Sequence, residues 1–109
     1  MGDDHEAAPE LSSLDKERRR YEFLKGPVPW MWLHSAMRTN SHAALCLALA
    51  IWHQSTCERT RTSKLRRRWQ RELGLSPEGV RGGLRRLRDA GLITVHFRPR
   101  CRAEVTILQ

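Results

Sequence analysis

Three arginines, Arg81, Arg85 and Arg88, have the residue type and spacing to do chemistry together. They follow one another at steps of four and three residues, so a helix would present them as one ridge. The planar guanidinium group donates a fork of hydrogen bonds that suits phosphate oxygens and the two major-groove acceptors of guanine. Like charges at this spacing cost a helix roughly 0.2–0.5 kcal/mol. We therefore expect the ridge to bind a polyanion rather than to serve solubility alone.

Further basic residues flank this ridge on both sides in the sequence, before it and near the C-terminus. If the polyanion is double-stranded DNA, we predict base contacts for Arg81 and Arg85, and Glu78 could accept a hydrogen bond from cytosine. The basic residues near the C-terminus would then reach flanking phosphates or a minor groove. The complete set of candidate contact residues is Lys64, Arg66, Arg67, Ser76, Glu78, Arg81, Arg85, Arg86, Arg98, Arg100 and Arg102.

Two His–Cys pairs could bind a metal instead. His42, Cys46, His53 and Cys57 stand at i, i+4, i+11 and i+15, within about 60° on one face of a helix. The two pairs would lie on the order of 16 Å apart along the axis, so each could give a zinc ion only two of its usual four ligands without a second chain. We favour core and boundary packing for these residues and expect neither a metal nor a cofactor.

No pattern in the sequence indicates an enzyme. It contains no P-loop, no nucleophile elbow, no His-Glu-x-x-His motif and no paired carboxylates on one expected element. We expect a non-enzymatic protein, and no small-molecule effector can be predicted.

Charge is distributed unevenly along the 109 residues, a length that suits one domain. The chain has 20 Lys and Arg against 12 Asp and Glu, a formal net charge of +8. Residues 1–15 contain five acidic residues and no Lys or Arg, whereas residues 58–104 contain fourteen basic and five acidic residues. This concentration of positive charge predicts a polyanionic partner for the C-terminal half.

The cysteine count and the hydropathy pattern indicate the compartment. Three cysteines without a Cys-x-x-Cys pair fit a reducing environment. The longest apolar run, residues 43–52, is about half a membrane span, and no secretory signal pattern is present. We expect a soluble cytoplasmic protein that does not enter a membrane.

The first half of the chain is expected to hold three helices. Residues 1–11 are predicted to form a disordered acidic tail, and residues 12–26 an amphipathic helix that ends at Gly26. A domain over 27–109 then begins with a short helix from Pro29 through Met37. Asn40 or Ser41 caps the next helix, whose apolar run predicts a helix buried on every face. All four tryptophans, at 30, 32, 52 and 69, are expected in the core.

The second half predicts two helices followed by a hairpin. Residues 58–64 could form a loop or a short strand. Leu65, Trp69 and Leu73 share one helical face, in a helix expected to start with Lys64 and Arg66 to Arg68 and to end at Gly74. Ser76 then caps a helix over 77–90 that buries Val80, Leu84 and Leu87.

The remainder alternates like two strands joined by a turn at Pro99 and Arg100. Ile93, Val95 and Phe97 would share the inner side of the first strand, and Val105 and Ile107 that of the second. Glycines 79, 82 and 83 are unusual within a helix. Close approach of the helix to DNA or to another helix could explain them, as could packing that outweighs a weak helix.

The chain resembles the winged helix-turn-helix family in the segment RRWQRELGLSPEGVRGGLRRLRDAGLITVHFRPRCRAEVTIL. The resemblance covers residues 62–108 well and residues 27–57 loosely. The resemblance implies a mainly α fold with a small C-terminal β-hairpin and a recognition helix in the major groove. We expect a bacterial transcriptional regulator that binds double-stranded DNA as a homodimer, with the dimer contact made by residues 14–25 or by the central apolar helix. A replication or recombination accessory protein of a mobile element, and an adaptor that binds an acidic protein or RNA, stay open as alternatives.

Overall fold

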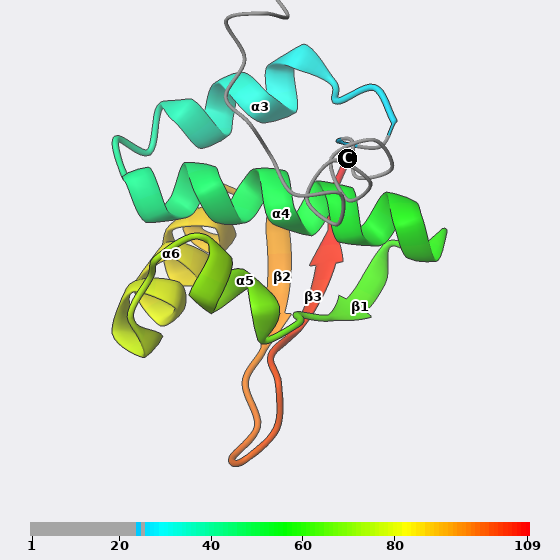
Figure 1. The fold of residues 1–109 in the computed structure, drawn as a ribbon. Helices are drawn as coiled ribbons and strands as arrows, with labels where there is room; N and C mark the ends of the chain where they lie inside the picture. Colours follow the sequence, from blue (N-terminus) through cyan, green and yellow to red (C-terminus); the bar gives the residue numbers. More distant parts are fainter. Residues whose placement is uncertain (1–23, 25) are drawn as a thin grey trace, which may run out of the picture.

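Four helices and three short strands make up the part of the chain that the computed structural model describes, which is Leu24 and residues 26–109 (Figure 1). The predicted tail over 1–11 and nearly all of the predicted helix over 12–26 lie outside the described residues. The elements, labelled as in Figure 1, are α3 (Trp30–Met37), α4 (His42–Glu58), β1 (Thr62–Lys64), α5 (Arg68–Glu72), α6 (Pro77–Asp89), β2 (Ile93–His96) and β3 (Glu104–Ile107).

Helix α4 is central to the fold, because α3, α6 and the sheet all pack against it. It begins at Ser41, whose Oγ accepts a hydrogen bond from the N–H of Ala44 at 3.1 Å, as one of the two predicted caps requires. Leu47 and Ile51 are completely buried. The expectation of burial on every face is wrong, since Cys46 and Leu49 stay partly exposed.

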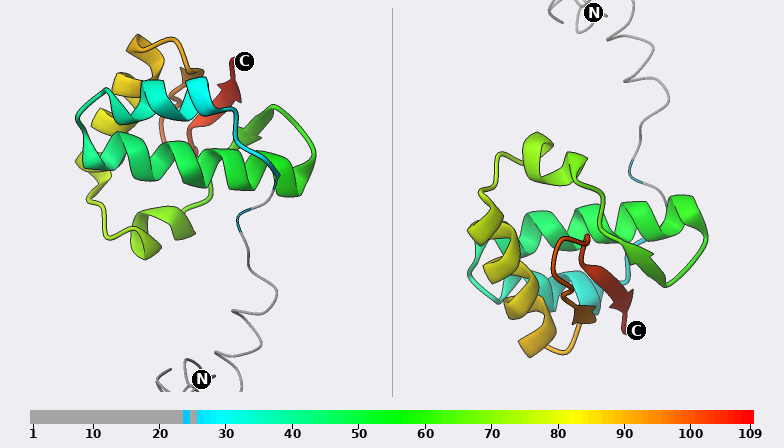
Figure 2. Two further views of the ribbon diagram at one scale, coloured as in Figure 1. Left: turned by 90° about the horizontal axis from the view of Figure 1, so that it is seen from above. Right: turned by 90° about the horizontal axis from the view of Figure 1, so that it is seen from below.

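Helix α3 follows Pro29, as predicted. It runs antiparallel to α4 (Figures 1 and 2). Trp32 is 5% exposed, and its indole N–H donates to the carbonyl of Leu92 at 3.1 Å, which ties α3 to the start of β2. The centre of its ring also lies 5.1 Å from the centre of the Trp52 ring. Trp30 was expected in the core but is 64% exposed. Two residues correspond to about 200° around a helix, so Trp30 and Trp32 point to opposite sides.

The strands form one antiparallel sheet in the order β1-β3-β2. The predicted hairpin is confirmed, with Ile93 opposite Ile107 and Val95 opposite Val105. Residues 62–64 pair with β3, so the open choice at 58–64 resolves to a strand at its end and the sheet has three strands. The prediction for Phe97 is wrong: β2 ends at His96, and Phe97 lies beyond the paired region, 40% exposed.

The C-terminal end of α5 and both ends of α6 are as predicted. Gly74 adopts φ +68° just after α5, and the Oγ of Ser76 accepts from the N–H of Gly79 at 2.9 Å. Leu84 and Leu87 are fully buried, Val80 is partly buried, and Gly91 at φ +80° ends α6.

Helix α5 starts later than predicted. Lys64 is the last residue of β1, and the N–H of Leu65 donates to the carbonyl of Ala103 at 2.8 Å. The chain is therefore held extended through residue 65, and the helix begins only at Arg68. The expectation that Lys64, Arg66 and Arg67 lie in the first turn of this helix is wrong.

One core joins all these elements, and residues 97–103 extend from it as a loop between β2 and β3 (Figure 1). Among the described residues, no helix combines the length and hydrophobicity that a membrane span requires. The core residues are Trp32, Ala36, Ala44, Leu47, Ala48, Ala50, Ile51, Leu65, Trp69, Leu84, Leu87, Leu92, Ile93, Val105 and Ile107.

Gly83 sets how closely α6 approaches α4. A Cβ at this position would lie 2.7 Å from Cδ1 of Leu47 and 3.1 Å from the backbone carbon of Ala43. We predict that Gly83→Ala lowers the free energy of unfolding by about 1–2 kcal/mol, because overpacking outweighs the gain in helix propensity. Urea unfolding followed by tryptophan fluorescence measures this change. An unchanged or higher stability would show that the two helices separate at no cost.

Candidate nucleic-acid interface

Helix α6 presents its arginines on the side away from the core. Gly83, Leu84 and Leu87 are buried against the domain, which leaves Arg81 and Arg85 exposed. Within the described residues neither of these two arginines forms an ion pair. Arg88, the third member of the predicted ridge, instead has Nη2 3.2 Å from Oδ1 of Asp89. The ridge therefore has two arginines whose charge is uncompensated.

Phe97 links the β2–β3 loop to α6. The guanidinium carbon of Arg85 lies 5.8 Å from the centre of the Phe97 ring, within the range of a cation–π contact. The alternation with Ile93 and Val95 predicts that Phe97 shares their side of the strand. Its position one residue beyond β2 leaves the ring free to contact the side of α6.

A groove of about 200 Å³ lies between α6, the segment before α5 and the β2–β3 loop. Arg81 of α6 and Arg102 of the loop both line it, together with Arg66 and Arg67. Apolar side chains, among them Leu65 and Val80, form the rest of its wall. Four predicted contact residues from three separate segments of the chain thus meet at one depression.

Two neighbouring hollows extend this positive surface. One is lined by Lys64, Arg66 and Arg102, and the other by Lys64, Arg67 and Arg100. Because the hollows share lining residues with the groove, they form one continuous surface, which we call the basic groove. Its basic predicted members are Lys64, Arg66, Arg67, Arg81, Arg100 and Arg102.

The other predicted contact residues are exposed but line none of these hollows. Arg86 lies about 140° around α6 from Arg81 at 100° per residue, on the opposite flank of the exposed surface. Ser76 and Glu78 are exposed in the first turn of α6. Ser76 Oγ already accepts the capping bond, so its hydroxyl hydrogen is what it could offer to a phosphate. Arg98 is exposed near the start of the β2–β3 loop.

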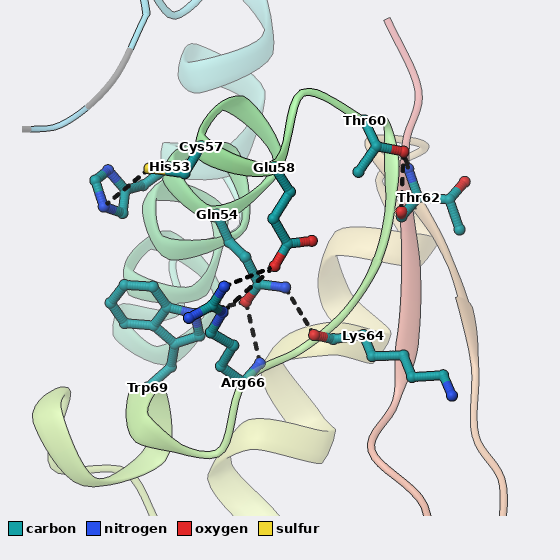
Figure 3. A network of polar contacts seen from close by, with 9 residues as sticks. All are labelled: His53, Gln54, Cys57, Glu58, Thr60, Thr62, Lys64, Arg66 and Trp69. Carbon is teal, nitrogen blue, oxygen red and sulfur yellow. Dashed lines mark hydrogen bonds and ion pairs between the residues drawn. The ribbon is translucent and has the colours of Figure 1, made fainter.

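The buried amide of Gln54 positions the basic segment between β1 and α5 (Figure 3). Its Nε2 donates to the carbonyl of Lys64 at 2.7 Å. Its Oε1 accepts from the backbone N–H of Arg66 at 3.0 Å and from the indole N–H of Trp69 at 2.8 Å. One side chain of α4 thereby holds the last residue of β1, the connecting turn and α5. This role could not be predicted from the sequence, because a glutamine in a helix is more often exposed to solvent.

Arg66 also forms an ion pair on the surface. Its Nη2 lies 3.1 Å from Oε2 of Glu58, the last residue of α4 (Figure 3). Both side chains are partly exposed, so the pair adds little stability, but it compensates part of the positive charge of Arg66. The other basic residues of the basic groove form no ion pair within the described part of the chain; they are Lys64, Arg67, Arg81, Arg100 and Arg102.

The two His–Cys pairs lie together as the spacing predicts. Nε2 of His42 lies 3.4 Å from Sγ of Cys46, and Nε2 of His53 lies 3.7 Å from Sγ of Cys57. In the described part of the chain, no three side chains of His, Cys, Asp or Glu gather closely enough to hold a metal. Among the described residues, each pair can therefore offer a metal ion at most two ligands from one chain.

Comparison with models of known families, with curated proteins and with solved structures finds no match to this chain. Its function must therefore be argued from its own residues.

Gln54→Leu tests how the basic segment is held in place. The change leaves the Lys64 carbonyl, the Arg66 N–H and the Trp69 indole N–H without their partner, in a site where Gln54 is 2% exposed. We predict a loss of about 2–4 kcal/mol in the free energy of unfolding, measured in urea. Thr62→Val is the control, since it removes one exposed hydrogen bond, to Thr106, and should cost less than about 1 kcal/mol. Equal effects of the two changes would contradict a central role for Gln54.

Proposed function

We propose that this protein binds double-stranded DNA with sequence specificity as a winged helix-turn-helix transcriptional regulator. In this proposal α6 is the recognition helix, and the β2–β3 hairpin with its loop is the wing. The observation that supports it most is the basic groove, in which Arg81 of α6 and Arg102 of the loop line the same depression. A surface that joins a helix and a loop in this way can contact bases and flanking phosphates at once.

The dimensions of the DNA major groove suit α6. A helix with its side chains is about 10–12 Å in diameter, and the major groove of B-DNA is about 12 Å wide. Arg81 and Arg85 would then reach base edges, where arginine can pair with both acceptors of guanine. Lys64, Arg67 and Arg100 would contact the backbone, where most of the affinity comes from charge.

The same argument favours DNA over double-stranded RNA. The major groove of A-form RNA is too deep and narrow for side chains to read, so an exposed helix with an arginine ridge has no equivalent site there. One module of this size offers limited specificity, and we therefore propose that the protein acts as a homodimer on two half-sites. Sedimentation with and without DNA measures the stoichiometry of that complex.

Arg81→Ala and Arg85→Ala should each weaken specific binding by about 1–3 kcal/mol, because each removes a contact to a base edge. The preferred duplex is first selected from a random library, and dissociation constants are then measured by fluorescence anisotropy. Both residues are exposed, so the thermal midpoint should stay nearly unchanged.

Arg61→Ala is the matched control for this experiment. Arg61 has the same charge and exposure, but it lines a hollow with Ile107 and Gln109, at the end of the sheet opposite the β2–β3 loop. Its loss should leave the discrimination between preferred and scrambled duplexes unchanged. If Arg81→Ala and Arg85→Ala bind the preferred duplex like the wild type, α6 is not the recognition helix. Tight binding to RNA or to an acidic protein with no preferred duplex would favour the adaptor alternative.

Replacing Arg98, Arg100 and Arg102 together with Ala should act through charge rather than sequence. The slope of log affinity against log salt is negative, and each lost phosphate contact makes it shallower by roughly one unit. We expect the same change for specific and scrambled duplexes. Titrations at several salt concentrations measure that slope. An identical slope in the triple variant would remove the β2–β3 loop from the interface.

A further inference from the structure

The three glycines of α6 have different surroundings, and only two of them are explained by the protein itself. Gly83 allows α6 to pack closely on α4, as described above. At Gly79 a Cβ would lie 3.2 Å from Oγ of Ser76, so its absence leaves room for the capping hydroxyl. At Gly82 a Cβ would meet nothing within 4 Å.

Gly82 lies on the outward crest of α6. At 100° per residue it is about 160° from Leu84 and about 140° from Leu87, the two residues that point into the core. Its neighbours on the helix surface are Glu78, Arg85 and Arg86, within about 40–60° of it. The crest therefore has a notch at Gly82, bounded by three long polar side chains that are all exposed.

Glycine at such a position weakens a helix relative to alanine, because it leaves the backbone more freedom to lose on folding. No packing contact within the described chain compensates for that loss at Gly82. A group outside the chain that needs the space of a side chain would account for it. Two of the three bounding side chains, Arg85 and Arg86, favour an anionic partner, and the third, Glu78, could accept a hydrogen bond from it.

We propose that Gly82 is where the backbone of α6 comes closest to the base edges in the major groove, an inference that rests on the proposed function. The missing side chain lets the helix axis sit deeper, which brings Arg85, about 60° from Gly82 on the helix surface, within hydrogen-bond range of the bases. A methyl group at residue 82 would hold the helix away from the groove floor. Gly82 is thus a positioning residue, which acts through the arginines beside it.

The variant Gly82→Ala separates this role from a structural one. We expect the thermal midpoint to rise by about 2–8 °C, since alanine favours the helix at this partly exposed site, where a Cβ meets nothing within 4 Å. We expect affinity for the preferred duplex to fall at least about tenfold, while affinity for a scrambled duplex changes by less than about twofold. Because the variant is more stable, unfolding cannot explain weaker binding.

Gly83→Ala is the control in the same helix. It should lower the thermal midpoint and, at a temperature where the protein stays folded, should leave the ratio of specific to non-specific affinity unchanged. A Gly82→Ala protein that binds the preferred duplex as tightly as the wild type overturns this inference alone. A wild-type protein that selects no duplex overturns the proposed function and this inference with it.

Discussion

The side-chain amide of Gln54 fixes the segment that contributes three of the six basic residues of the basic groove, Lys64, Arg66 and Arg67. It belongs to a buried side chain of α4 and forms hydrogen bonds with three groups, the Lys64 carbonyl, the Arg66 N–H and the Trp69 indole N–H. A buried amide without partners is costly, so satisfying these bonds selects one path for the chain between β1 and α5. That path places Lys64, Arg66 and Arg67 beside the β2–β3 loop, which the Leu65–Ala103 hydrogen bond holds from the other side.

Holding these arginines and lysine together has an electrostatic cost that the domain compensates only in part. Glu58 pairs with Arg66, which itself lines the basic groove, and Glu72 pairs with Arg68. The other charges of the basic groove have no acidic partner among the described residues, and salt screens the repulsion among them. Such an arrangement is stable enough because the core beneath it is apolar and continuous, and it leaves the positive field available to an anion.

Local signals in the sequence were enough to predict most of the elements and their ends. Ser41 and Ser76 cap helices, Gly74 and Gly91 end them, and the alternation around Val95 and Val105 gives the hairpin, because each depends on residues close in the chain. The start of α5 could not be predicted in this way. Leu65 fits a helical stripe with Trp69, but its N–H is bonded to Ala103, 38 residues away. The predictions for Trp30 and Phe97 were wrong for a related reason. Each residue continues an apolar pattern in the sequence beyond the point where the core ends.

The predicted contact residues show the same division between local and long-range information. Arg81 and Arg85 could be placed from the helical period alone, because the stripe of Leu84 and Leu87 fixes which side faces the core. That Arg81 shares a groove with Arg102, twenty-one residues later, follows only from how the hairpin folds back beside α6.

Helix α6 has a weak intrinsic tendency to be helical, yet its position in the domain is strongly fixed. Its three glycines reduce helix propensity, and its arginines repel one another, so the isolated segment has little reason to be helical. Stability comes instead from the cap at Ser76 and from Leu84 and Leu87, which pack on the side facing α4. The outward side makes few contacts within the described chain, such as that between Arg85 and Phe97, so packing constrains its composition little. A helix that is held mainly from one side leaves its other side available to a partner.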